Sequence, residues 1–421
     1  MSRFWVETLG CPKNQVDSEK ITGLLCQQGM VEAASADQAQ LVVVNTCAFI
    51  EEARQESVET VLRMRAEAAE AELVVTGCMA ERYGAELAEA MPEVDRVAGF
   101  GVPVSIGASS SSDASSSCQA IQVPEFDLLN LPRSPVAAPW AYVKIAEGCD
   151  RRCGYCAIPS FRGPQRSRSM NAILAEVDQL GVREVVLVAQ DLAAYGRDQG
   201  QGERSIVPLM QQLTQRVSWL RLLYLYPSDL TAPLINAICN SSVPYFDLSL
   251  QHVSRPLLAR MRRWGDGERF ATRIAKIRQC RPDAVFRSNF IVGYPGETEA
   301  DHDALLEFLN EMNLDWCGFF AYSPEAGTYS TTLDCQVPAE LAAERLRELS
   351  EVQDQITAAK RDQLIGCEVK VLVDAPGVAR SYREAPEIDG IIAVPEHLKV
   401  GQFHTVRIIQ AIGPDLLAAT P

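Results

Sequence analysis

Short apolar runs alternate with helical patterns through the first 340 residues of the chain. In the amino-terminal part, three runs each end in a small or polar residue followed by cysteine, at 4–11, 41–47 and 73–78. Helix-like stretches follow them, for example at 17–28 and 51–70. Alternating strands and helices form parallel sheets. The pattern therefore predicts a parallel α/β domain over residues 1–107.

The central part repeats the same alternation six times. Helical patterns separate the apolar runs, and the clearest helix places Met170, Ile173 and Val177 on one face. The six runs are 140–146, 184–189, 220–226, 245–250, 285–292 and 316–322. Repeated strand–helix units predict a parallel sheet curved into a partial (β/α)6 barrel, similar to part of a TIM barrel, over residues 140–340.

The carboxyl-terminal pattern changes to one long helix followed by short strands. The helix is expected over 338–364, Gly366 ends it, and residues 341–365 are interpreted as a connection between domains. Short apolar runs with Gly and Pro turns follow at 367–373, 390–394 and 403–411. They predict a small β-barrel over residues 366–421.

Residues 108–139 interrupt these patterns and are interpreted as a linker. Residues 108–117 are all Ser, Ala or Asp, a composition that cannot bury a core, and several prolines follow. A functional hinge and a simple tether both remain open for this segment.

Composition narrows the class of protein. The 421 residues are 47% hydrophobic, but no apolar run is long enough to span a membrane, and the amino terminus is typical of a strand rather than a signal peptide. We therefore expect a cytoplasmic protein that does not bind a membrane. The net charge of −16 argues against wide contact with nucleic-acid phosphates and favours a basic protein partner. In such a chain, thirteen cysteines are more typical of metal ligands and buried small residues than of disulfides.

Cys149, Cys153 and Cys156 are spaced C-x3-C-x2-C within eight residues. Three thiolates on one loop suit zinc or an iron–sulfur cluster. A closed zinc or electron-transfer site uses four protein ligands, whereas the next cysteine is Cys239. The spacing favours a cluster with one iron open to another ligand; a zinc knuckle or a buried cysteine trio is the alternative.

Cys11, Cys47 and Cys78 occupy the same position in three successive strand-to-helix turns. The carboxyl ends of parallel strands line one crevice, so these thiols should meet there. Each alone would be a typical buried cysteine, but together they predict a second three-cysteine site.

Further polar residues follow the predicted central strands, where ligands of barrel enzymes bind. They are Gln190–Asp191, Gln251–His252, 293–297 and 323–325. Arg162, Arg166 and Arg168 could pair with a carboxylate of a bound cofactor or substrate, although a solvated basic face is the default interpretation. With four histidines and no Ser/His/Asp arrangement, acid–base hydrolysis is poorly supported.

The C-x3-C-x2-C spacing, with Tyr155 just before the last cysteine, resembles the signature of the radical S-adenosylmethionine (SAM) superfamily. The resemblance implies a [4Fe–4S] cluster on Cys149, Cys153 and Cys156, whose open iron binds SAM. It also implies that Tyr155 lies near the adenine of SAM. Gln190, Gly293 and Glu297 are the further SAM contacts that we expect.

The amino-terminal motifs resemble those of the methylthiotransferases within that superfamily. This resemblance implies a second, auxiliary [4Fe–4S] cluster on Cys11, Cys47 and Cys78. Residues 9–19 and 45–50, followed by Glu56 and Ser57, resemble the branch that modifies an aspartate of the small-subunit ribosomal protein S-twelve (uS12). The branches that modify tRNA carry charged residues where this chain has 48–50, Ala-Phe-Ile.

The carboxyl-terminal barrel resembles the TRAM domain, which binds RNA in the tRNA-modifying relatives. Residues 360–421 hold 7 basic and 8 acidic residues, so a protein-docking barrel is favoured over an RNA-binding one, with a purely structural barrel as the alternative.

The expected activity is replacement of an unactivated C–H bond on the β-carbon of the uS12 aspartate by a methylthio group. It would require an electron donor such as a flavodoxin or ferredoxin, and a sulfur donor. The alternatives are methylthiolation of tRNA adenosine and a non-enzymatic iron–sulfur or zinc protein.

Overall fold

The computed structural model describes residues 1–104, 127–200 and 202–420. Contacts divide the chain into two compact units. The first holds residues 1–135 with 147–149 and 157–164, and the second holds 136–146, 150–156 and 165–421. The serine-rich stretch and Cys118 lie outside the described residues. Among the described residues, no helix combines the length and the apolar character needed to cross a membrane.

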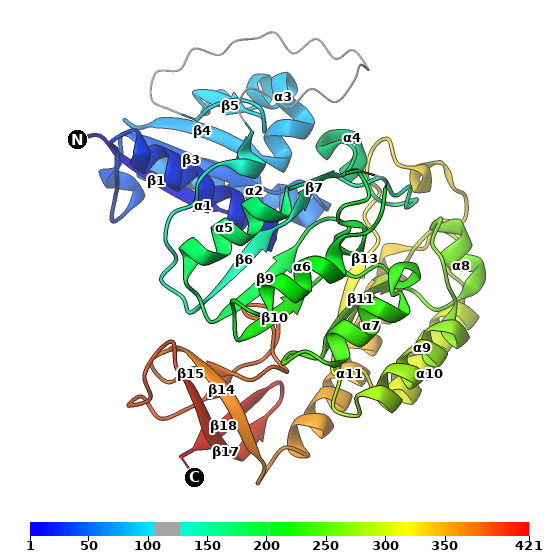
Figure 1. Ribbon diagram of the computed structural model, residues 1–421. Coiled ribbons are helices and arrows are strands. Elements are labelled where there is room, and N and C mark those ends of the chain that lie inside the picture. Colours follow the sequence, from blue (N-terminus) through cyan, green and yellow to red (C-terminus); the bar gives the residue numbers. More distant parts are fainter. Residues whose placement is uncertain (105–126, 201, 421) are drawn as a thin grey trace. The chain divides into compact units, whose positions relative to one another are not determined.

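The first unit is built on a five-stranded parallel sheet in the order β2-β1-β3-β4-β5 (Figure 1). The strands are β1 Arg3–Thr8, β2 Val31–Glu32, β3 Leu41–Thr46, β4 Glu72–Gly77 and β5 Arg96–Ala98. The main helices are α1 Pro12–Gln27, α2 Glu51–Glu67 and α3 Cys78–Ala90. Alternate residues of β3 face opposite sides, so Leu41 and Val43 pack with α1, while Val42 and Val44 pack with α2 and α3. Burial on both faces explains the continuous apolar run of this strand.

The second unit contains the six predicted strands in parallel and in sequence order (Figure 1). They are β6 Trp140–Lys144, β9 Glu184–Val188, β10 Trp219–Leu222, β11 Tyr245–Gln251, β12 Val285–Val292 and β13 Trp316–Ala321. A bridge between Leu225 and Leu248 joins the β6-β9-β10 half to the β11-β12-β13 half. The partial barrel predicted from the sequence is confirmed.

Helices connect these strands and cover the sheet. They are α5 Met170–Leu180, α6 Ile206–Leu213, α7 Ala232–Cys239, α8 Arg255–Arg260, α9 Gly267–Cys280 and α10 Glu299–Met312. The remaining short elements are β7 Ala146–Glu147, α4 Ile158–Arg162, β8 Arg166–Ser167 and the 3-10 turns Ala36–Gln38, Leu128–Asn130, Leu192–Ala194, Pro227–Asp229 and Tyr329–Thr332.

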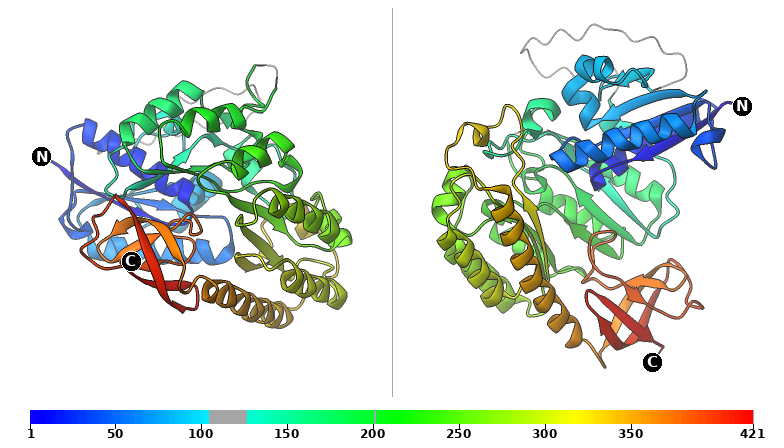
Figure 2. Two further views of the ribbon diagram at one scale, coloured as in Figure 1. Left: turned by 60° about the horizontal axis from the view of Figure 1, so that its bottom comes forward. Right: turned by 180° about the vertical axis from the view of Figure 1, so that it is seen from behind.

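Helix α11, Ala339–Asp362, runs beside α10 and β13 and leads into the small β-barrel (Figure 2). The barrel is closed in the order β14-β15-β16-β18-β17. Its strands are β14 Glu368–Ala375, β15 Val378–Arg380, β16 Ile392–Ala393, β17 Phe403–Ile412 and β18 Asp415–Ala419. The predicted barrel is confirmed, with β15 and β18 as strands that the pattern did not indicate.

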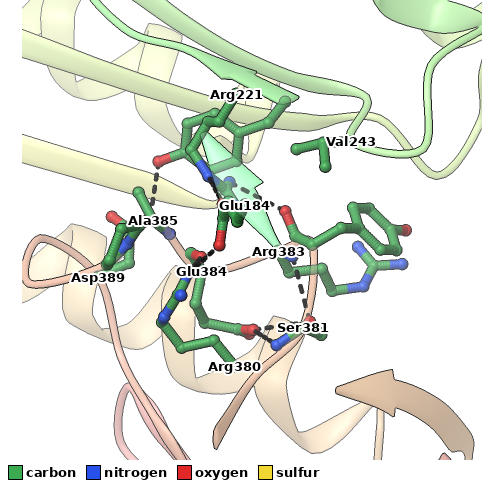
Figure 3. A network of polar contacts seen from close by, with 12 residues as sticks. Glu184, Arg221, Val243, Arg380, Ser381, Arg383, Glu384, Ala385 and Asp389 are labelled. Atoms are coloured by element: carbon green, nitrogen blue, oxygen red, sulfur yellow. Dashed lines mark hydrogen bonds and ion pairs between the residues drawn. The ribbon is translucent and has the colours of Figure 1, made fainter. Parts of the chain in front are cut away.

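A buried network of charges joins the segment after β15 to the amino-terminal ends of the central strands (Figure 3). Glu184, which is 0% exposed, accepts hydrogen bonds from Arg221 Nε and Arg380 Nη1, both at 2.9 Å. Glu384 pairs with Arg361 and accepts the N–H of Ser381 at 2.7 Å. Each carboxylate thus has cationic or N–H partners, as buried charges require.

Candidate metal and cofactor sites

Cys11, Cys47 and Cys78 follow the carboxyl ends of the neighbouring strands β1, β3 and β4. Gly10 has φ +88°, and a Cβ there would lie 2.7 Å from Cys47 Cβ and 2.9 Å from its Sγ. Gly77, next to Cys78, has φ +91° and would place a Cβ 2.3 Å from Asn45 Oδ1. Both positions require glycine because of their backbone conformation and this close approach. The structure therefore brings the three amino-terminal cysteines together.

The three thiols influence one another electrostatically. Burial, together with repulsion from Cys78 and Cys11, raises the pKa of Cys47 to about 12. Burial also raises the pKa of Cys78, although Arg162 opposes the shift. For Cys11, burial is outweighed by Lys13, Arg162 and nearby backbone N–H groups, so its pKa is lowered. Cys11 is also the residue that caps α1, and the amino-terminal end of a helix favours a thiolate.

The donor set fits an iron–sulfur cluster better than a single ion. Across residues 1–104, 127–200 and 202–420, no three His, Cys, Asp or Glu side chains are grouped closely enough to hold one metal ion. A structural zinc ion needs four ligand atoms about 2.0–2.3 Å away. A four-iron cluster is larger than one ion and accepts cysteine ligands, so the chemistry of three thiols suits it.

Amide and hydroxyl side chains hold the loops that carry these thiols. Asn14 Nδ2 donates to the carbonyl oxygens of Leu9 (3.0 Å) and Thr46 (2.9 Å), while its Oδ1 lies 3.6 Å from Cys78 Sγ. Ser57 Oγ accepts the N–H of Cys47 at 3.1 Å. Asn14 and Ser57 lie in the segments that carried the family resemblance, and their contacts give them a role in positioning the loops.

Arg162 also belongs to this group of the first unit. Its Nη2 donates to Asn14 Oδ1 at 3.0 Å and to Cys78 Sγ at 2.9 Å, and its Nη1 pairs with Glu147 at 2.6 Å. In the second unit, Arg168 is buried and pairs with Glu176 at 2.7 Å. A solvated basic face is therefore wrong for both arginines.

Cys149 lies in the first unit, where its N–H donates to the carbonyl oxygen of Gly163 at 3.1 Å. The preceding Gly148 has φ +78°, and a Cβ there would collide with Pro164 O at 2.1 Å. The turn that leads into the C-x3-C-x2-C loop thus depends on glycine.

Cys153, Tyr155 and Cys156 lie together in the second unit. Arg263 Nη1 approaches Cys153 Sγ at 3.5 Å, and its guanidinium stacks 4.1 Å from the ring centre of Tyr226. Burial raises the pKa of Tyr155 well above its ordinary value; Arg263 opposes the shift and the two cysteines add to it. The N–H of Gly154 donates to Met261 O at 2.8 Å and fixes the loop.

A second set of charges lies beside this loop. Arg151 pairs with Asp191 at 2.6 Å and also with Asp229, and it stacks 3.9 Å from the centre of the Tyr226 ring. The sequence reasoning named Asp191 but missed Arg151, Tyr226, Asp229 and Arg263. Tyr226 and Asp229 follow the third central strand, so the strand-end rule could have identified them.

Gly293 and Glu297 have structural partners. A Cβ on Gly293 would lie 2.7 Å from Ala342 Cβ of α11, so packing requires glycine there. Glu297 accepts the N–H groups of Gly293 and Tyr294 and pairs with Arg345 at 3.3 Å. Gln190 lies two residues after the end of β9. Contacts of Gln190, Gly293, Glu297 and Tyr155 with SAM stay predictions.

Comparison with known proteins gives three family matches. Residues 3–99 match the Uncharacterized protein family UPF0004, residues 143–309 match the Radical SAM superfamily, and residues 365–420 match the TRAM domain. Among solved structures, the radical S-adenosylmethionine methyltransferase TsrM from Kitasatospora setae is 12% identical, with a TM-score of 0.50 over 95% of this chain and 84% of that one. At this identity the likeness shows the fold alone.

Curated relatives match over nearly their whole length. The "Ribosomal protein uS12 methylthiotransferase RimO" of Moorella thermoacetica is 41% identical, and the match covers 97% of each chain. Proteins with the same name from Myxococcus xanthus and Aquifex aeolicus are 40% and 39% identical; they cover 99% and 98% of this chain and 91% and 96% of their own. The chain is therefore an enzyme, and the alternative of a non-enzymatic iron–sulfur or zinc protein is wrong. It belongs to the RimO family of radical SAM methylthiotransferases.

Proposed function

We propose that this enzyme adds a methylthio group to the β-carbon of an aspartate in ribosomal protein uS12. The observation that carries the proposal is the identity of 36–41%, over almost the whole chain, to relatives that bear the uS12 methylthiotransferase name. An aliphatic C–H bond has no accessible pKa, so general bases cannot activate it and a radical is required. The cofactor supplies such chemistry, while the protein orients the reactants.

The two cysteine triads are the proposed ligand sets. Cys149, Cys153 and Cys156 would hold the [4Fe–4S] cluster that binds SAM, and Cys11, Cys47 and Cys78 would hold the auxiliary [4Fe–4S] cluster. When bound, these cofactors supply hydrogen-atom abstraction and the methylthio group. The proposed domains are the auxiliary-cluster domain 1–107, the radical SAM domain 140–340 and the TRAM-like barrel 366–421, with 108–139 and 341–365 as connections.

The surrounding residues would prepare both sites. Gly10 allows Cys11 and Cys47 to converge, and Asn14 holds the carbonyl oxygens of two cysteine-bearing loops. The lowered pKa of Cys11 favours the thiolate that a metal requires. Arg263 contacts the Cys153 sulfur and is itself fixed by stacking on Tyr226, as outer-shell partners are at metal sites.

The partners follow from this chemistry. An electron donor such as a flavodoxin or ferredoxin and a sulfur donor are proposed, and the ribosomal substrate would place the enzyme in the cytoplasm. The balance of 7 basic and 8 acidic residues in 360–421 supports a barrel that docks a protein rather than tRNA.

A direct assay separates the substrates. Reduced, reconstituted enzyme would be incubated with SAM and sulfide, together with purified uS12, intact small subunits or tRNA. Mass spectrometry should find the increment of one methylthio group on a uS12 aspartate. An increment on tRNA adenosine, with none on free or ribosome-bound uS12, would overturn the proposal.

A further inference from the structure

Arg162 connects the segment after the C-x3-C-x2-C loop with the amino-terminal cysteines. It is the last residue of α4, and it lies in the first unit with Cys78, Asn14 and Glu147. Its side chain is buried, with 8% of the residue exposed. Burying a guanidinium is costly unless its charge and N–H groups have partners. The identity of those partners therefore indicates what the residue is for.

The two ends of the guanidinium have different partners. Nη1 lies 2.6 Å from Glu147 Oε1 and 3.8 Å from Asp17 Oδ2. Nη2 lies 2.9 Å from Cys78 Sγ and 3.0 Å from Asn14 Oδ1. The plane packs 4.4 Å from the ring centre of Phe100. Carboxylates and the ring thus fix the orientation that directs Nη2 at the sulfur, a use for which the planar arginine fork is suited.

A hydrogen bond from a cation to sulfur is strongest when the sulfur is negatively charged. A thiolate that ligates a metal carries such charge, whereas a neutral thiol is a weak acceptor. The neighbouring charges act on Cys78 in opposite directions: the Arg162 guanidinium, 2.9 Å from the sulfur, attracts negative charge there, and the Glu147 carboxylate, which pairs with Arg162 at 2.6 Å, repels it. Arg162 and Glu147 therefore form a pair whose net field at the sulfur depends on both members.

We propose that Arg162 is a positioning residue that hydrogen-bonds the Cys78 sulfur and raises the reduction potential of the auxiliary cluster, with Glu147 moderating its effect. This inference rests on the proposed role of Cys78 as a ligand. Reduction adds negative charge to a cluster, and hydrogen bonds and nearby charge set the potentials of such clusters. In a buried site the charge of Arg162 is weakly screened. Its loss should therefore make reduction harder.

The test uses the full-length chain with Cys149, Cys153 and Cys156 replaced by alanine, so that only the auxiliary cluster is loaded. The potential would be measured by redox titration, with the EPR signal of the reduced cluster as the readout. Arg162→Gln should shift the midpoint to more negative potential, and Arg162→Lys should shift it less. Glu147→Gln should shift it in the positive direction.

Arg96→Gln is the matched control. Arg96 is equally buried in the first unit and pairs with Glu72 at 3.4 Å at the opposite end of the sheet. The Arg96→Gln substitution should leave the midpoint potential of the auxiliary cluster unchanged. A merely structural role for Arg162 would not produce shifts of opposite sign in the Arg162 and Glu147 variants.

Each outcome has a defined meaning. An unchanged potential in Arg162→Gln, or shifts of the same sign in Arg162→Gln and Glu147→Gln, overturns the inference and leaves the cluster assignment intact. If Arg162→Gln loads no iron, an unchanged potential in Glu147→Gln overturns it. If the background chain itself binds no iron or sulfide, the proposed auxiliary site fails, and the inference fails with it.

Discussion

At the scale of single residues, a few side chains determine how the three amino-terminal thiols can approach. Gly10 leaves room for Cys47 where a Cβ would collide with it, Asn14 bridges two of the cysteine loops, and Ser57 holds the backbone of Cys47. The three thiols could be identified from the sequence, because each cysteine follows an apolar run. Their supports could be recognised only once the strands were side by side, because Asn14 and Thr46, for example, are 32 positions apart.

Gly10→Ala should reduce iron loading of the auxiliary site at least several-fold. The new Cβ would lie 2.7 Å from Cys47 Cβ, at a backbone φ of +88° that alanine disfavours. Gly29→Ala is the control, because Gly29 has φ +83° but nothing within 4 Å of a Cβ. Iron and sulfide analysis after reconstitution, with the C-x3-C-x2-C cysteines replaced by alanine, would measure the effect. Equal iron loading in the Gly10 and Gly29 variants would contradict it.

His252 should make stability depend on pH. Burial lowers its pKa to about 4, Asp301 opposes the shift, and His302 and Arg345 add to it. Its Nδ1 accepts the N–H of Ser254 at 3.1 Å, a bond that protonation of Nδ1 would break. The unfolded chain takes up a proton near pH 6.5, so the free energy of unfolding should fall by about 3 kcal/mol between pH 6.5 and 4.

Thermal unfolding midpoints of wild type and His252→Asn, followed over that pH range, would test this expectation. The variant should show a shallower loss of stability on acidification. The exposed His397→Asn serves as control and should keep the wild-type slope. If the unfolding midpoints of wild type and His252→Asn fell equally steeply with pH, His252 would not contribute to the pH dependence of stability.

At the scale of elements, the sequence pattern predicted the long buried strands and missed the short strands at the edges of the first sheet. Strands β3, β4, β6 and β9 are largely apolar runs because both of their faces are buried. Strands β2 and β5 contain two and three residues, too few to show a period. Helix α1 begins at Pro12 rather than at residue 17, because Cys11 caps it and Pro12 occupies its first turn.

The C-x3-C-x2-C loop depends on an arginine that the sequence reasoning missed. Arg263 follows a short helix and reaches Cys153 from 110 positions away. Arg263→Gln should lower the rate of SAM cleavage to 5′-deoxyadenosine by about 10- to 100-fold, as losses of outer-shell partners typically do. Arg269→Gln, which removes an exposed arginine of α9, should leave that rate unchanged. SAM cleavage at the wild-type rate in the Arg263 variant would show that the C-x3-C-x2-C loop does not depend on Arg263.

At the scale of the whole chain, the carboxyl-terminal barrel is held to the central sheet by charges rather than by apolar contacts alone. Glu184 lies between Arg221 and Arg380 (Figure 3). Tyr245 donates to Asp389 at 2.6 Å. None of these charges could be assigned a partner from the sequence, because the pairs join segments far apart in the chain. Buried pairs of this kind fix one arrangement of segments at a cost in stability if one partner is removed.

Glu184→Ala should destabilise the enzyme by about 3–5 kcal/mol, because Arg221 would be left buried without its carboxylate and Arg380 would keep only Asp374. The exposed pair Glu368–Arg407, at 2.9 Å, gives the control variant Glu368→Ala, which should change stability by less than about 1 kcal/mol. Denaturant unfolding followed by circular dichroism would compare the two. Similar midpoints for both variants would contradict the importance of the buried network.

The central claim is that two separate three-cysteine sites serve two different steps of one reaction. The most direct measurement is the formation of 5′-deoxyadenosine and of methylthiolated uS12 in parallel, for Cys78→Ala, Cys153→Ala and the exposed control Cys26→Ala. Cys78→Ala should still cleave SAM but should yield no methylthiolated uS12. Cys153→Ala should lose both products, and Cys26→Ala should keep both. Methylthiolation of uS12 at the wild-type level by the Cys78 variant would contradict the claim.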